Sequence, residues 1–174
     1  TDQQRWDTVG PRGDWVRTPN LDRIAARGVL FDNCITTTPV CVPARLSLAT
    51  GLYPHNTGVW ANCGHTLSTE SPTWFQAIRD QGYRTSVFGK THWHAAHRTH
   101  LSEGEPLLHA YGFHDCVEVL GPRASARSRS YMTDAWEEAG LWRAYQEDYA
   151  ERFANVPHVV RESPLGPELY YDAW

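Results

Sequence analysis

Apolar residues recur at helical spacing early in the chain, and a short apolar run follows them. Residues 18–28 open with Thr-Pro and close with Gly, which is typical of a helix with defined ends. Within this segment Leu21, Ile24 and Ala25 share one face. Residues 29–35 carry the β-branched and aromatic side chains that favour a strand. The pattern therefore predicts a helix followed by a strand.

The same order of elements recurs further along the chain. Residues 71–82 begin with Ser-Pro-Thr and end with Gly, which predicts a second helix. Residues 83–88 then contain Val and Phe in a strand-like run. Repeated alternation of helix and strand is typical of α/β proteins. We therefore predict an α/β fold with a mostly parallel sheet flanked by helices.

Towards the carboxyl end the pattern predicts one more helix, preceded by a loop. The region from about residue 134 to residue 150 is expected to be helical and exposed, with Trp136, Leu141 and Tyr145 as its apolar contacts. Residues 121–132 are polar and contain several arginines, which favours a loop over the surface.

The composition limits the expected partners. With 174 residues the chain is long enough for one domain with its own core. The net charge is −4 and no basic run stands out, so a nucleic acid is not an expected partner. No run of about 18 apolar residues occurs, so no membrane span is predicted. An anionic substrate would have to meet a local cluster of cations rather than a positive overall field.

The four cysteines do not form a metal or redox motif. None belongs to a C-x-x-C pair, which argues against a zinc site or a thioredoxin-like motif. Cys34, Cys63 and Cys116 are most simply explained as small buried apolar residues. The fourth, Cys41, stands in a more distinctive context.

Residues 41–51 predict a short helix with Cys41 at its start. Pro43 suits the first helical turn, where a missing N–H removes no bond, and Gly51 suits the end. Unbonded N–H groups and the positive end of the helix dipole would then surround Cys41. Such a terminus suits sulfate or phosphate. Arg45 lies one turn on and can reach back toward position 41.

The run Cys-Val-Pro-Ala-Arg-Leu-Ser-Leu-Ala-Thr-Gly at these positions resembles the sulfatase signature C-x-P-[SA]-R-x-x-x-x-T-G. In that family the cysteine is oxidised to formylglycine by a formylglycine-generating or maturase enzyme. One hydroxyl of the hydrated aldehyde attacks the ester, and deprotonation of the other expels sulfate and regenerates the aldehyde. The resemblance implies an alkaline-phosphatase-like fold and catalytic roles for Cys41 and Arg45.

A second motif follows the strand predicted at 83–88. Gly89-Lys90-Thr91-His92 resembles the G-K-x-H element that sulfatases carry after a strand. The resemblance implies that Lys90 and His92 contact the sulfate ester and the formylglycine oxygens. A lysine supplies a point charge to an anion, and a histidine can donate a proton near neutral pH. His94 is a further candidate for substrate contact.

Four other polar residues accompany these motifs. Asn62 and His65 follow the predicted helix and are candidates for the rim of the pocket. His97 and His100 continue the histidine-rich run and are expected to be solvated.

The resemblance also implies a divalent cation. Sulfatases begin with a strand that ends in Asp-Asp or Asp-Gln, and Asp2 and Gln3 match that position. Carboxylate and amide oxygens are suitable calcium ligands, although Gln3 lacks the charge of the commoner second Asp. The expected metal ligands are therefore Asp2, Gln3 and the oxidised Cys41. Calcium is the expected metal, with Mn²⁺ and Mg²⁺ as alternatives.

The match to the family begins at Asp2, and residues 168–174 are typical of the first turn of a helix. We therefore interpret residues 1–174 as the amino-terminal part of a sulfatase catalytic domain, truncated at both ends. The family draws further metal ligands, another lysine and another histidine from later in the chain. The fragment alone is therefore expected to be inactive. The parent protein is expected to be cytoplasmic or periplasmic.

Two functional alternatives stay open at this point. The leading one is hydrolysis of a small-molecule or carbohydrate sulfate ester. The other is a phosphonate or phosphate monoester hydrolase of the same superfamily, which shares the Asp-Gln pair and the cysteine motif and often uses manganese. Lys90 and His92 favour the sulfatase, because the phosphonate enzymes usually lack that element.

Overall fold

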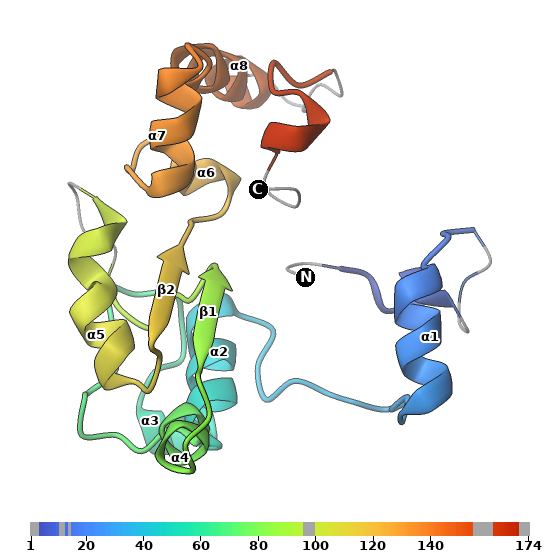
Figure 1. The fold of residues 1–174 in the computed structure, drawn as a ribbon, viewed down its shortest axis with the longest axis vertical. Helices are drawn as coiled ribbons and strands as arrows, with labels where there is room; N and C mark the ends of the chain where they lie inside the picture. Colours follow the sequence, from blue (N-terminus) through green and yellow to red (C-terminus); the bar gives the residue numbers. More distant parts are fainter. Residues whose placement is uncertain (1–3, 11–12, 14, 96–99, 155–161, 171–174) are drawn as a thin grey trace. The chain divides into compact units, whose positions relative to one another are not determined.

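A computed structural model describes residues 4–10, 13, 15–95, 100–154 and 162–170. The chain divides into two units, Thr1–Thr36 and Thr37–Trp174, which are described separately (Figure 1). The first unit contains η1 (Trp6–Thr8) and α1 (Pro19–Arg27). The second contains α2 (Cys41–Thr50), α3 (Pro54–Thr57), α4 (Trp74–Asp80), β1 (Ser86–Gly89), η3 (Leu101–Gly104), α5 (Glu105–Ala110), β2 (Asp115–Glu118), α6 (Pro122–Ser125), α7 (Tyr131–Glu138), α8 (Trp142–Ala154) and η4 (Pro167–Leu169).

The helix predicted in the first unit is confirmed as α1. Thr18 precedes it, but its hydroxyl oxygen does not cap the helix. It accepts a hydrogen bond from the Gly10 N–H at 2.7 Å and donates one to Asp22 at 2.9 Å. Thr18 therefore ties the preceding loop to the first turn of α1.

The strand predicted over residues 29–35 is wrong, because the structure shows only turns and irregular backbone there. Its apolar side chains are exposed, with 75% exposure at Val29, 72% at Phe31 and 87% at Ile35. A strand needs a neighbouring strand to bond its N–H and C=O groups. Apolar composition alone does not supply that neighbour.

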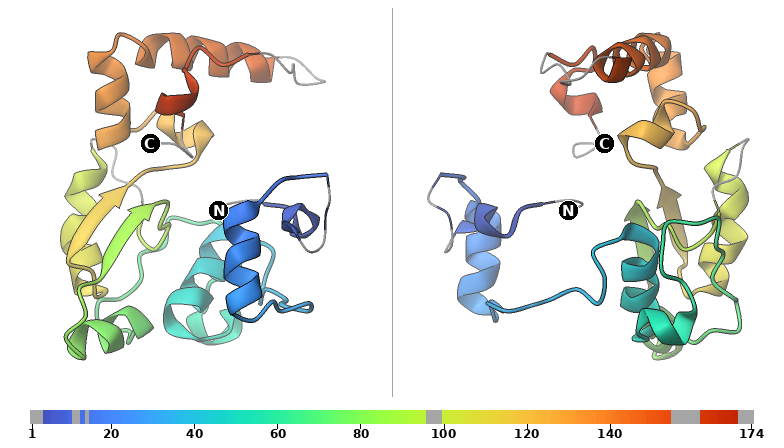
Figure 2. Two further views of the ribbon diagram at one scale, coloured as in Figure 1. Left: turned by 45° about the vertical axis from the view of Figure 1, so that its right-hand side comes forward. Right: turned by 180° about the vertical axis from the view of Figure 1, so that it is seen from behind.

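The strand predicted at 83–88 is confirmed over its second half, as β1 in the second unit. It pairs in parallel with β2, with Ser86 opposite Asp115 and Gly89 opposite Glu118. Helix α5 lies between the two strands in the chain, as parallel pairing requires. In each view α2 lies beside β1 and α5 beside β2 (Figures 1 and 2). The described residues therefore form a mixed α/β unit with a two-stranded parallel sheet.

One hydrophobic cluster packs α2, α4 and the loops around the sheet. Its members are Val42, Leu46, Ala49, Val59, Leu67, Phe75, Trp93, Leu108, Tyr111 and Phe113. The rings of Trp93 and Phe113 stack with centroids 5.7 Å apart, and Phe75 lies 5.0 Å from Trp93. Trp93 belongs to the loop after β1, so burial of its indole anchors that loop to the core.

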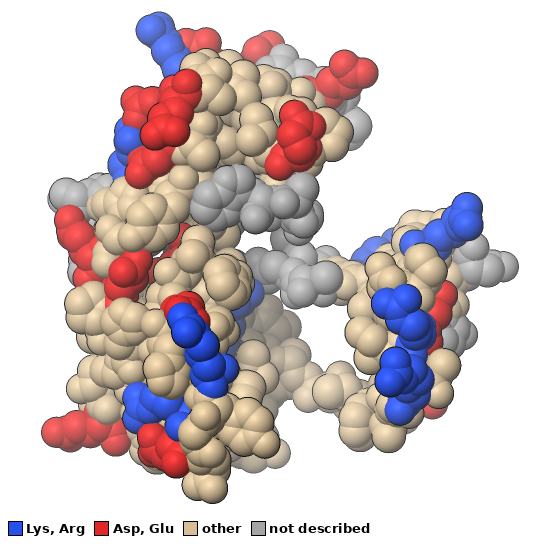
Figure 3. Space-filling view, in the orientation of Figure 1, with Lys and Arg blue, Asp and Glu red and all other residues tan. Residues whose placement is uncertain are grey.

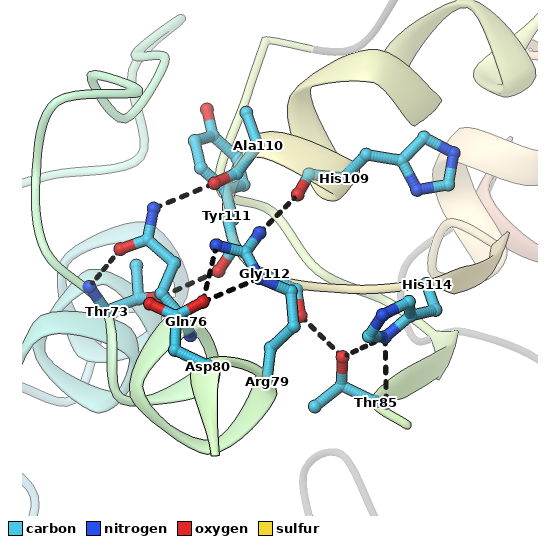
Figure 4. Close-up of polar contacts among 10 residues, drawn as sticks. All are labelled: Thr73, Gln76, Arg79, Asp80, Thr85, His109, Ala110, Tyr111, Gly112 and His114. Atoms are coloured by element: carbon cyan, nitrogen blue, oxygen red, sulfur yellow. Dashed lines mark hydrogen bonds and ion pairs between the residues drawn. The ribbon is translucent and has the colours of Figure 1, made fainter. Parts of the chain in front are cut away.

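Helix α4 is held against the turn between α5 and β2 by polar contacts (Figure 4). The Thr73 hydroxyl caps α4 by accepting from the Gln76 N–H, and it donates to the Tyr111 carbonyl at 2.6 Å. The Gln76 amide donates to the Ala110 carbonyl at 2.8 Å. Gly112 has φ 116°, and a Cβ there would lie 2.5 Å from the Gln76 nitrogen. Glycine therefore permits the backbones to meet.

A second cluster is built by the carboxyl-terminal helices and contains Met132, Trp136, Tyr145 and Leu165. The single helix predicted over 134–150 is instead two helices, α7 and α8, separated at Gly140 with φ 71°. The predicted apolar contacts are confirmed, because Trp136 and Tyr145 are 0% and 4% exposed and Leu141 packs against the same cluster. The two helices turn on Gly140 and bury these aromatic faces against each other.

Two further expectations concern the segments around this cluster. The loop predicted over 121–132 is wrong in part, because Pro122–Ser125 form α6 and α7 begins at Tyr131. The helical turn predicted over 168–174 is found as η4 through Leu169, and residues 171–174 lie outside the described part. Among the described helices, the length and apolar character that a membrane crossing requires do not occur together.

We expect Thr73→Ala to lower the free energy of unfolding by about 1–2 kcal/mol, because it removes both a helix cap and a buried hydrogen bond. Thr73→Ser is the matched control, because it keeps the hydroxyl that makes both bonds. Urea unfolding of the two variants and the parent measures the difference. Equal midpoints for the Ala and Ser variants would contradict the assignment.

Candidate active site

Helix α2 places Cys41 at its first position, as the sequence predicts. Val40 before it is extended, and Gly51 ends the helix in the left-handed region with φ 74°. The first turn is not fully open to an anion, however. The Val42 N–H donates to the Asn62 side-chain oxygen at 2.9 Å. Asn62 therefore caps α2 from 20 residues away.

The loop after β1 brings Lys90 to Cys41. The Lys90 Nζ lies 3.8 Å from the Cys41 Sγ, within hydrogen-bond reach of sulfur. Lys90 is the single lysine of the 174 residues, against 15 arginines. An ammonium at this point can donate to a thiolate or to an oxygen in place of the sulfur. The two sequence motifs therefore meet in space, although 49 residues separate these side chains.

Arg45 holds the same loop. Its guanidinium donates to the Lys90 carbonyl at 2.5 Å, and its own carbonyl accepts from the Trp93 indole at 2.9 Å. The guanidinium thus binds the backbone of the Lys90 loop. A role for Arg45 in orienting the oxidised form of Cys41 stays a prediction.

His92 has a left-handed backbone, with φ 62°. Among the described non-glycine residues, no other has a positive φ. This conformation costs about 1–2 kcal/mol for a residue with a Cβ. It persists only where surrounding contacts determine it, and such residues concentrate at functional sites. The backbone geometry thus singles out the histidine of the second motif.

His94 lies in the interior, 4% exposed. Its Nε2 is 2.8 Å from a Glu118 carboxylate oxygen, and its Nδ1 is 3.0 Å from the Ala95 carbonyl. Burial lowers the pKa of His94, but the hydrogen bond and charge of Glu118, with the Ala95 carbonyl, outweigh it, so the pKa is raised above 6.5. Substrate contact through His94 stays a prediction.

The predicted metal ligands Asp2 and Gln3 lie outside the described residues. Within the part that the structure describes, no group of three or more His, Cys, Asp or Glu side chains could hold a metal ion. The fit of a cation to Cys41 therefore has no support in the described geometry, and we derive no chemical step through a metal.

The remaining candidates have varied surroundings. His65 is half-buried, and His97 lies outside the described residues. His100 is half-buried rather than solvated, because its ring nitrogens contact Ser102 at 2.6 Å and Asp134 at 3.1 Å. These contacts give it a structural role at the start of η3.

The expectation of three buried cysteines is wrong for two of them. Cys34 and Cys63 are exposed, and Cys116 is half-buried. The first two lie in irregular segments and belong to neither hydrophobic cluster of the described residues.

Charged side chains are distributed differently over the two units. In the view of Figure 3, acidic and basic side chains are interspersed over the second unit, whereas basic ones gather along the unit that contains α1. At Cys41 the structure places the Lys90 ammonium within reach of an anion.

Sequence reasoning missed Glu118 and Thr91. Glu118 ends β2 and is 5% exposed, and the Thr91 hydroxyl donates to its carboxylate. A carboxylate at the carboxyl end of a parallel strand is a usual site signal in α/β folds. That signal was hidden because the four residues of β2 were not recognised as a strand.

The sulfatase family model matches residues 1–163, so the chain belongs to the sulfatase family. It is 42% identical over 93 residues to an ulvan-active sulfatase of Formosa agariphila, and this match covers 53% of this chain and 18% of that protein. It is 32% identical over 164 residues to the N-acetylgalactosamine-6-sulfatase of Sus scrofa, which covers 84% of this chain and 30% of that protein.

A solved structure supports the family fold. The chain resembles the crystal structure of a protein described as the sulfatase yidJ of Bacteroides fragilis, with a TM-score of 0.51 and 39% identity. The likeness covers 56% of this chain and 23% of that one. The chain thus spans less than a third of the length of each of these proteins.

The raised pKa of His94 predicts a pH-dependent stability. A histidine whose folded pKa lies above its unfolded value stabilises the fold fully below about pH 6.5, and this contribution is lost as the pH rises through the folded pKa. We expect the urea midpoint to fall from pH 6 toward pH 9, and to fall less in His94→Gln. His55→Gln, which removes an exposed histidine, is the control. Parallel pH profiles for all three proteins would contradict the prediction.

Proposed function

We propose that the protein containing this chain hydrolyses a sulfate ester through a formylglycine formed from Cys41. The observation that supports this most directly is the 3.8 Å approach of Lys90 to Cys41, which joins the two family motifs at one point. Membership of the sulfatase family supports hydrolysis of a sulfuric ester as the class of reaction. The aldehyde, the metal and the substrate belong to the proposal.

Each side chain then has a physical task. The hydrated aldehyde at position 41 supplies the hydroxyl that attacks the ester and the second hydroxyl whose deprotonation releases sulfate. Lys90 compensates the negative charge that gathers on the sulfate oxygens. His92 donates a proton to the leaving oxygen. Arg45 acts by holding the Lys90 backbone, through the hydrogen bond to its carbonyl.

The start of α2 supports the same reading. The positive end of a helix dipole favours an anion near Cys41, although Asn62 takes one of the first N–H groups. A helix dipole and one ammonium provide local positive charge that favours a sulfate group, although the net charge of the chain is −4. Lys90 therefore supplies positive charge where the ester would bind, without a positive overall field.

The proposed partners follow from the family. The substrate is a small-molecule or carbohydrate sulfate ester, and the names of the ulvan and N-acetylgalactosamine relatives favour a sulfated sugar. A formylglycine-generating or maturase enzyme would oxidise Cys41. Calcium is the proposed cation, with Asp2, Gln3 and the oxidised residue 41 as ligands. We propose residues 1–174 as the amino-terminal part of the catalytic domain, in a cytoplasmic or periplasmic protein.

Oxidation of Cys41 has a direct signature. Conversion of the thiol to the aldehyde lowers the mass of the peptide that contains residue 41 by about 18 Da. We expect this loss in peptides from active full-length protein, with the Cys116 peptide as an internal control of unchanged mass. Full activity in protein whose Cys41 is unmodified would contradict the proposal.

Removal of the ammonium beside Cys41 is expected to impair the reaction. We expect Lys90→Met to lower kcat/KM for p-nitrophenyl sulfate by about 10²–10³-fold, because charge that develops in the transition state loses its compensation. The matched control is Arg84→Met, which removes an exposed cation paired with Asp115 in β2. Rates on phenyl phosphonate are measured in parallel, and a preference for the phosphonate would favour the phosphonate hydrolase instead.

A further inference from the structure

Glu118 is a buried carboxylate at the carboxyl end of β2. It lies opposite Gly89 in the parallel register, beside the point where the Lys90 loop begins. It is 5% exposed, so its charge is removed from water. A buried carboxylate is costly unless partners bond to both of its oxygens.

Both partners come from the Lys90 loop. The Thr91 hydroxyl donates to one carboxylate oxygen, and the His94 Nε2 lies 2.8 Å from the other. These two residues stand on either side of His92 in the sequence. One carboxylate therefore binds the loop on both sides of the histidine of the G-K-x-H motif.

The His94 ring completes the charge balance. Its Nε2 faces the Glu118 carboxylate and its Nδ1 faces the Ala95 carbonyl, and both of these groups are acceptors. An imidazole that carries both protons donates to each of them, whereas a neutral imidazole donates to one. The doubly protonated ring also compensates the charge of Glu118.

The groups around this pair permit the arrangement. A Cβ at Gly104 would lie 2.5 Å from the His94 ring, so glycine leaves the space that the imidazole fills. Burial and the charge of Glu118 raise the pKa of Tyr111 to about 12, which keeps that phenol neutral. Thr91, 0% exposed, is uncharged. Among these neighbours, Glu118 and His94 are the pair that carries charge.

The contacts of Glu118 with Thr91 and His94 help to explain the left-handed backbone at His92. His92 stays in the left-handed region, which has a cost that neighbouring contacts must offset. The Thr91 and His94 anchors, together with the Arg45 bond to the Lys90 carbonyl, supply such contacts on both sides. These contacts therefore help to hold His92 in this conformation.

We propose that Glu118 is a positioning residue, which acts through Thr91 and His94 to fix Lys90 and His92 for attack on the sulfate ester. This inference rests on the proposed function. Glu118 itself binds Thr91 and His94, and through them it holds the loop that carries Lys90 and His92, the two groups proposed to contact the ester. Misplacement of a reacting group by about 1 Å can cost about 10²-fold in rate.

The test uses variants of the full-length protein assayed on p-nitrophenyl sulfate. Glu118→Gln keeps the shape of the side chain and removes its charge, and Asp115→Asn is the matched control at the other end of the same strand, where the side chain is half-buried and paired with Arg84. We expect Glu118→Gln to lower kcat by about 10–100-fold with a smaller change in KM, because the lysine charge is still present but poorly placed. Asp115→Asn is expected to stay within about twofold of the parent.

A second pair of variants covers a failure of Glu118→Gln to fold. Thr91→Val removes the donor to Glu118, and Thr91→Ser retains it, so we expect a loss of kcat in the first and not in the second. A folded Glu118→Gln protein with the parent's kcat, or equal losses in Thr91→Val and Thr91→Ser, would overturn the proposal.

A spectroscopic measurement separates this inference from the proposed function. In ¹⁵N-histidine NMR spectra near neutral pH, with His94 assigned from His94→Gln, we expect both ring nitrogens of His94 to be protonated. In Glu118→Gln the ring is expected to lose a proton at lower pH. If the parent does not hydrolyse the aryl sulfate, the proposed function fails. The spectra still test the contact between Glu118 and a doubly protonated His94 ring. A neutral His94 ring in the parent at that pH would contradict the proposed pairing of Glu118 with His94, whether or not the protein is active.

Discussion

Two hydrogen bonds that run in opposite directions tie α2 to the loop after β1, and the candidate site depends on them. The Arg45 guanidinium donates to the Lys90 carbonyl, and the Trp93 indole donates to the Arg45 carbonyl. Arg45 lies one helical turn after Cys41, so these bonds set the separation between the cysteine and the lysine. A helix start and a strand end thereby form one corner of the fold.

The junction between the start of α2 and the loop after β1 is supported by both apolar and polar contacts. Trp93 stacks on Phe113 in the main hydrophobic cluster, and this packing anchors the loop to the core. Glu118 holds the same loop through polar contacts at a point removed from water. Strained backbone at His92 can persist there because several independent contacts determine it. Packing supplies the stability, and the buried polar pair supplies the geometry.

The helices with strong local signals were predictable, and the strands were less so. Helices α1, α2 and α4 have Pro in or near the first turn, and glycine follows at or near each end. The segment 29–35 has strand composition but no neighbour in the described part of its unit. Strand β2 carries Asp, Cys, Val and Glu, a composition with little strand signal, and it forms because β1 is available to pair with it.

The sequence by itself determined the family, the helix that begins at Cys41, and the identity of Lys90 and His92 as the second motif. These depend on short runs of residues whose chemistry and spacing are visible along the chain. Only the tertiary structure decided that Lys90 meets Cys41, that Asn62 caps α2, and that Glu118 grips the loop. Such contacts join residues 20 to 49 positions apart, and packing of a helix against a parallel strand pair, rather than local propensity, brings them together.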